Sequence, residues 1–88
     1  MLHLTDESLR NISEASKEFY VWDTELTGFG VRVLKSGKKI FVVRLWRAPN
    51  TQKLISLGSV ESMTVDAARE AAARLKHDFW IETVEGAN

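Results

Sequence analysis

The side chains best placed to do chemistry in this sequence are cations concentrated in one stretch. Residues 28–58 contain basic side chains and no acidic one: Arg32, Lys35, Lys38, Lys39, Arg44, Arg47 and Lys53. Both flanking stretches are acidic in balance, and the 88 residues together carry a formal net charge of zero. Basic groups gathered on one face favour binding to a polyanion. An ordinary solvated sheet face with scattered lysines is the alternative interpretation.

No pattern typical of catalysis or metal binding accompanies these cations. The chain has no cysteine, which excludes disulfides, thiolate zinc sites and cysteine nucleophiles. Its two histidines, His3 and His77, are far apart and lack the spacing of metal ligands. The sequence also lacks a nucleophile elbow, a phosphate-binding loop and a paired-carboxylate arrangement. We therefore expect no catalytic residue, no metal, no cofactor and no small-molecule substrate.

The composition is that of one small globular domain. Hydrophobic residues make up 44 % and charged residues 27 % of the chain. A chain of this length buries about 60–65 % of its unfolded surface, so it needs no disulfide or metal for stability. No apolar run approaches the roughly 20 residues that cross a bilayer, and the first residues do not begin a signal peptide. We expect a cytoplasmic domain without membrane contact.

Alternation and turn signals predict the elements that position the cations. Strands are expected at 28–34, 40–47 and 53–57, with turns at 35–38 and 48–51.

A helix is expected from a cap at Thr64 to about Ile81, with an apolar stripe of Ala68, Ala71, Ala72, Leu75 and Phe79. Thr5 starts a short helix or turn that ends near Ala15. The expected fold is α+β, a three-stranded antiparallel sheet with the C-terminal helix on one face. Residues 20–22 are left open as an additional short strand.

The alternation divides the sheet into two faces. The core face holds Phe29, Val31, Val33, Phe41, Val43, Leu45, Ile55 and Leu57. The opposite, uncovered face holds Arg32, Arg44, Trp46, Leu54 and Ser56.

Arginines on an uncovered face offer forked donors for base edges or phosphates, with salt bridges to the acidic flanks as the alternative. Trp46 either stacks on a ligand or packs beneath the N-terminal segment, and both readings stay open. Three further aromatic side chains are expected in the core or in contacts between domains: Trp22, Phe79 and Trp80. Cations at the strand ends are placed to reach flanking phosphates: Lys35, Lys38, Lys39 and Arg47.

Several segments, in this order, resemble one known family. They are Leu4-Thr5-Asp6, Val21-Trp22-Asp23-Thr24, Gly28-Phe29-Gly30-Val31-Arg32-Val33, Ser36-Gly37-Lys38-Lys39, Phe41-Val42-Val43-Arg44, Leu57-Gly58 and Ala68-Arg69-Glu70-Ala71. The ordered set is similar to the N-terminal arm-type DNA-binding domain of prophage and genomic-island integrases of the tyrosine recombinase family. Leu54 departs from the family pattern because a basic or polar residue is usual there, and Trp46 replaces a more usual tyrosine.

The resemblance implies that a three-stranded sheet enters the major groove of arm-type sites on double-stranded DNA, supporting integration and recombination. Arg32, Lys39 and Arg44 fall on positions that are typically basic in the family. Charge, sheet face and resemblance together give the expected DNA-binding set: Arg32, Lys35, Lys38, Lys39, Arg44, Trp46, Arg47, Lys53 and Ser56. Residues 1–84 would form the arm-binding domain and residues 85–88 the start of a linker. The catalytic tyrosine would lie elsewhere in the integrase, whose other domains and protomers become expected partners at the bacterial nucleoid.

Two other functions compete with DNA binding. A double-stranded RNA-binding domain shares the α-β-β-β-α order, but reads RNA partly through a basic start of its last helix. Here that helix begins Thr64-Val65-Asp66, which argues against RNA. The second competitor is a protein-interaction module that docks through Trp46 and Leu54 on the open face.

Overall fold

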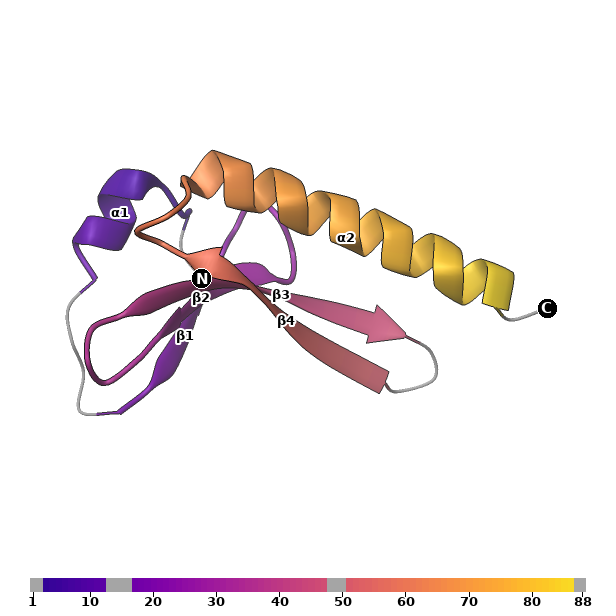
Figure 1. Cartoon of the computed structure of the whole chain (residues 1–88), viewed down its shortest axis with the longest axis horizontal. Helices are drawn as coiled ribbons and strands as arrows, with labels where there is room; N and C mark the ends of the chain where they lie inside the picture. Colours follow the sequence, from indigo (N-terminus) through magenta and orange to yellow (C-terminus); the bar gives the residue numbers. More distant parts are fainter. Residues whose placement is uncertain (1–2, 13–16, 48–50, 87–88) are drawn as a thin grey trace.

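The computed structural model describes residues 3–12, 17–47 and 51–86. Its elements along the chain are α1 (Asp6–Arg10), β1 (Phe19–Trp22), β2 (Phe29–Val33), β3 (Lys39–Arg47), β4 (Thr51–Ser59) and α2 (Val65–Gly86). The strands form one antiparallel sheet in the order β1-β2-β3-β4, and α2 lies along one face of it (Figure 1). The α+β fold is therefore four-stranded, and the additional strand that the sequence left open is β1.

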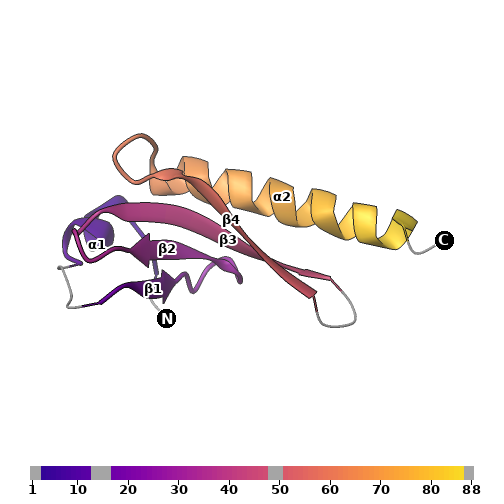
Figure 2. The same cartoon turned by 60° about the horizontal axis from the view of Figure 1, so that its bottom comes forward.

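The two longest strands continue beyond the rest of the sheet as a ribbon. The pairing of β2 with β3 ends at Phe29 opposite Val43, followed by a hydrogen bond from the Arg44 amide to the Gly28 carbonyl (2.7 Å). Past this point β3 pairs with β4 alone, down to Arg47 opposite Thr51. Figure 2 shows this two-stranded arm extending beyond β1 and β2.

The core lies between the sheet and the helices, on the face that the alternation predicts. Its buried side chains are Leu4, Leu9, Phe29, Val31, Val33, Phe41, Val43, Leu45, Val65, Ala68 and Ala72. Ile55, Leu57, Leu75 and Phe79 pack against them while remaining partly exposed. The predicted core face is confirmed, and so is the helix stripe except for Ala71, which is not among the core residues. Small alanine side chains let the helix approach the strands closely.

The ends of several elements differ from the sequence expectations. α1 ends at Arg10 with Asn11 as its C-cap, because the amide of Asn11 turns back to the carbonyl of Ser8. The expected end near Ala15 lies outside the described residues. β4 is longer than predicted because its cross-strand pairing with β3 carries it through Gly58 to Ser59. α2 likewise continues past Ile81 to Gly86.

A buried ion pair ties β1 to α2. The Asp23 side chain is fully buried and accepts hydrogen bonds from the amides of Leu4 and Leu26 (3.0 Å each) and from Arg69 Nε (3.0 Å). The Arg69 guanidinium also donates to the Leu4 carbonyl at 2.8 Å. Burial alone would raise the pKa of the Asp23 carboxyl. The hydrogen bonds from Arg69 and the backbone amides outweigh it, so the pKa lies below its ordinary value.

Candidate nucleic-acid interface

One face of the sheet is left without a helix, and we call it the open face. Side chains alternate across a strand, so the register identifies its members. Tyr20 pairs with Arg32, Arg44 pairs with Leu54, and Trp46 pairs with Gln52. A further row across all four strands consists of Trp22, Gly30, Val42 and Ser56. Large apolar side chains are exposed here, with Trp46 at 57 % and Leu54 at 45 %.

Aromatic rings surround one arginine of the open face. Trp22 stacks on Tyr20 with centroids 5.4 Å apart and planes 5° from parallel. The guanidinium carbon of Arg44 lies 4.2 Å from the Trp22 ring centroid and 5.9 Å from that of Trp46. Both distances are within the range of cation–π attraction. The Arg44 side chain is therefore restrained by contact with two indoles.

Gly30 explains how the Trp22 ring lies close against β2. A Cβ atom at Gly30 would come within 2.7 Å of the Trp22 ring and 2.6 Å of the Val21 carbonyl oxygen. Any side chain at this position would lift the indole away from the strands. The glycine of β2 thus permits the tryptophan of β1 to reach Arg44 on β3.

The two arginines of the open face have different surroundings. Arg32 forms an ion pair and hydrogen bond with Glu18, just before β1. The hydrogen bond from Arg32 lowers the pKa of the Glu18 carboxyl. Among the side chains described for residues 3–12, 17–46 and 52–79, by contrast, no carboxylate lies in ion-pair range of Arg44. The salt bridge that the sequence offered as an alternative is thus present at Arg32 and is not found at Arg44.

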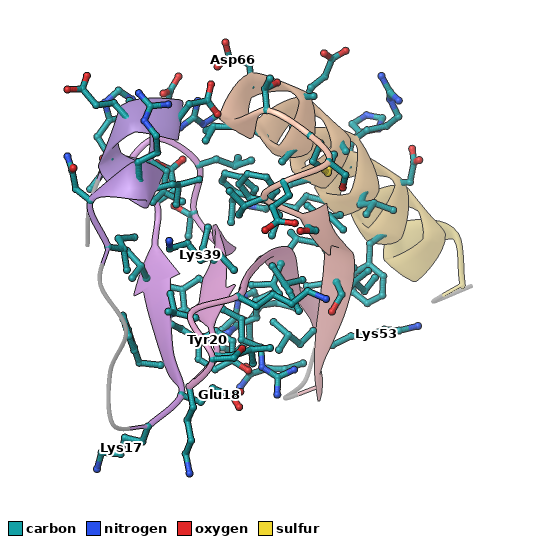
Figure 3. The ribbon with its side chains drawn as sticks, turned by 60° about the vertical axis from the view of Figure 1, so that its left-hand side comes forward. Lys17, Glu18, Tyr20, Lys39, Lys53 and Asp66 are labelled. Atoms are coloured by element: carbon teal, nitrogen blue, oxygen red, sulfur yellow. The ribbon has the colours of Figure 1, made fainter. Side chains whose placement is uncertain are left out.

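Two of the predicted site residues lie on the helix side of the sheet. Lys53 is opposite the core residue Leu45, and Lys39 opposite the core residue Val33, so both point away from the open face. Lys39 lies beside α1, in an open groove that Arg10 and Glu61 also line (Figure 3). The same view shows Tyr20 and Glu18 away from both helices. The alternation of side chains along each strand was a sequence signal that could have predicted a different face for these lysines than for Arg44.

The remaining predicted residues lie at the strand ends or on the open face. Lys35 and Lys38 are exposed in the β2–β3 hairpin, where Gly37 adopts the expected positive φ of 89°. Ser56 is exposed on β4, and Arg47 is the last residue of β3, with a side chain outside the described part of the structure. Trp46 projects outward instead of packing internally, and its contact with a ligand stays a prediction.

Of the two positions expected for Trp22, the core is wrong, and a contact with another domain stays a prediction. Phe79 packs against the core as expected, and the side chain of Trp80 lies outside the described residues. Trp22, however, lies on the open face, because β1 pairs with β2 and turns Phe19 and Val21 toward the core. The alternation of residues 19–22 puts Trp22 on the face opposite to Phe19 and Val21. Which of the two faces is the core follows only from the pairing of β1 with β2.

The described residues contain no group of three or more metal-ligating side chains. Within the same part of the chain, no helix is long and apolar enough to cross a membrane.

Comparison with known proteins identifies the family of this chain. A search of curated proteins gave no match. A family described as "Arm DNA-binding domain" matches residues 4–80, which include every strand, α1 and most of α2. The matched region is a DNA-binding domain and not a catalytic one. The chain therefore belongs to the arm-type DNA-binding domains that are found in phage integrases.

Proposed function

We propose that this domain binds arm-type sites of a phage-type integrase as double-stranded DNA, with its open face in the major groove. The observation that carries the proposal is the uncovered face bearing Arg44, a cation with no carboxylate partner in the described structure, in a chain of the arm DNA-binding family. In this role the domain would anchor a tyrosine recombinase at its arm sites during integration and recombination.

The dimensions of the sheet suit this mode of binding. Neighbouring strands lie about 4.8 Å apart, so three strands span roughly 10 Å between their outer axes. The major groove is about 12 Å wide and admits a two-stranded ribbon. The arm formed by residues 44–47 and 51–54 is such a ribbon, and Arg44, Trp46 and Leu54 lie on one face of it.

We propose that cations at the strand ends contact the flanking phosphates. Lys35 and Lys38 are exposed at the hairpin, from which their side chains could reach the phosphates beside the groove. Arg47, at the other end of β3, is assigned the same role by its position. Lys39 and Lys53 belong to the helix side, so in this proposal they contribute long-range attraction more than direct contact.

The test is an amide NMR titration of the domain with a short mixed-sequence duplex at low and high salt. Perturbations should gather on the open face and the β2–β3 hairpin, and they should weaken as salt rises. Arg44→Ala should weaken binding by about 1–3 kcal/mol. Arg74→Ala removes the same charge from the exposed side of α2, where Arg74 pairs with Glu70, and should change binding little. Equal losses in both variants would contradict groove insertion.

A protein-docking role is the second candidate, because Trp46 and Leu54 expose apolar surface on the same face. Absence of any perturbation by DNA at low salt would favour it. RNA binding through the start of α2 is disfavoured, because Arg69 is engaged there by Asp23.

The wider setting is proposed from the family alone. The other domains and protomers of an integrase would be the protein partners, and a bacterial nucleoid the location. The division into residues 1–84 and a linker from 85 also remains a prediction.

A further inference from the structure

We infer that the open face reads a guanine beside a thymine, with Arg44 bound to the guanine, Leu54 on the thymine methyl group, and Trp22 positioning Arg44. This inference rests on the proposed function and adds the base step that the domain would select.

Arg44 is suited to a guanine edge by its contact with Trp22. Its guanidinium carbon lies 4.2 Å from the centroid of the indole, over the ring. Arginine stacks on aromatic faces, and a stacked guanidinium directs its N–H groups outward in its own plane. Guanine presents two acceptors, N7 and O6, which match two parallel donors of arginine. Because Trp22 and Trp46 already restrict the side chain, less rotamer freedom is lost on binding.

Arg32 is less suited to the same task. Its guanidinium is engaged by Glu18, which would have to be displaced before both donors reached a base. A carboxylate carried into the groove would also be repelled by the phosphates. The arrangement therefore favours Arg44 as the guanine reader of the two arginines.

Leu54 supplies the neighbouring contact. It lies directly across the strand pair from Arg44, and such partners have Cβ atoms about 4.5–5.5 Å apart. Stacked base pairs are separated by about 3.4 Å, so the two side chains address adjacent pairs. Leu54 is 45 % exposed and offers no hydrogen bond, which makes the thymine methyl its natural partner in the major groove.

The first experiment selects duplexes from a randomised DNA pool with the 88-residue chain at low salt. The sequences recovered should share a guanine next to a thymine. The selected duplex is then made with 7-deazaguanine, which lacks the N7 acceptor, or with deoxyuridine, which lacks the methyl group. We expect 7-deazaguanine to weaken binding by wild type about five- to tenfold. Deoxyuridine should weaken it about fourfold, the value of one buried methyl group.

Protein variants assign each loss to its side chain. Arg44→Ala should bind the guanine and 7-deazaguanine duplexes equally, and Leu54→Ala the thymine and uridine duplexes equally. Trp22→Leu should reduce the preference for guanine over 7-deazaguanine, whereas Trp22→Phe keeps a ring beneath Arg44 and should restore part of it. Arg74→Ala should retain both preferences.

The outcomes distinguish a failure of the base preference from a failure of DNA binding itself. Binding to DNA with no shared step, or with preferences unaffected by Arg44→Ala and Leu54→Ala, would overturn the inference and leave DNA binding standing. Failure to bind any duplex at low salt would overturn both. A preference that survives Trp22→Leu in a folded protein would remove the positioning role of Trp22.

Discussion

Asp23 is a carboxylate with no exposed surface whose oxygens are nevertheless fully occupied. Two backbone amides and the Arg69 guanidinium surround it, and the structure leaves no buried side-chain polar atom without a partner in its described part. A buried charge of this kind is costly unless every partner is present. Its role is to join the N-terminal segment, the end of β1 and the first turns of α2.

We predict that Asp23 makes the domain sensitive to acid. Its folded-state pKa lies below the ordinary value of about 3.9, so its stabilisation is present above that pH and is lost as pH falls through the folded-state pKa. Asp23→Asn should lower the free energy of unfolding at neutral pH by about 3 kcal/mol. Urea denaturation from neutral pH to about pH 3 measures both effects.

The difference between wild type and Asp23→Asn should shrink toward acid. Asp78→Asn is the control, because Asp78 is exposed and contacts only His77 among the ion pairs described. A gap between wild type and Asp23→Asn that stays constant at every pH would contradict the assignment.

A second residue-scale prediction concerns Glu18. It neutralises Arg32 at the edge of the open face, close to where phosphates would lie. Glu18→Gln should raise DNA affinity by about two- to fivefold at low salt, because it removes one repulsive charge and releases Arg32. Glu7→Gln on α1 makes the same charge change away from this face. Fluorescence anisotropy measures both affinities. Equal gains for the two variants would show that the effect comes from the change in net charge and not from the release of Arg32.

At the scale of elements, α1 and α2 are joined by a cap that crosses the chain. Thr64 caps α2 locally by accepting from the Ala67 amide (3.2 Å), and Asp6 accepts from the Val65 amide (3.0 Å). Asp6 is itself the first residue of α1, so one carboxylate lies at the positive ends of two helices.

We predict that Asp6→Ala destabilises the domain by about 1 kcal/mol, the usual value of a helix cap. The control is Glu7→Ala, which removes an acid from the same turn without touching α2. Thermal unfolding of both variants measures the difference. A melting temperature for Asp6→Ala equal to that of the control would show that Thr64 alone caps α2.

The elements also show what sequence could and could not predict. Period-two alternation identified the central strands and their buried face, because Val31, Phe41 and Val43 repeat the pattern without interruption. The ends of β4 and α2 depended on pairing and packing beyond the local sequence. The face of Trp22 depended on which strand β1 joins, and the pairing of Asp23 with Arg69 connects residues 46 positions apart. Contacts of that range leave no local signal.

At the scale of the molecule, charge is distributed unevenly between the two sides. On the helices, acids such as Asp6 and Glu70 alternate with bases such as Arg10 and Arg74, so charge there is mixed. The open face and its hairpin carry an excess of cations: Arg32, Lys35, Lys38 and Arg44, with Glu18 as the acid beside Arg32. Figure 3 shows Asp66 on the helix side, far from Lys17 at the opposite end of the view. A neutral domain with this distribution is oriented as it approaches DNA, because the phosphates attract the side that carries the excess of cations.

This division leads to a prediction that separates phosphate contacts from base contacts. With roughly four to six phosphates neutralised, the logarithm of the binding constant should fall against that of salt concentration with a slope of about −4 to −5. Replacing both Lys35 and Lys38 by Gln should reduce the steepness by about 2, since each lysine releases counterions from one phosphate. Arg44→Ala should weaken binding at every salt concentration while changing the slope much less, because its proposed ligand is a base. Anisotropy titrations over a salt series compare the three proteins. A slope lowered as much by Arg44→Ala as by one lysine would make Arg44 a phosphate contact, and a slope that the lysine variant leaves unchanged would remove the hairpin from the interface.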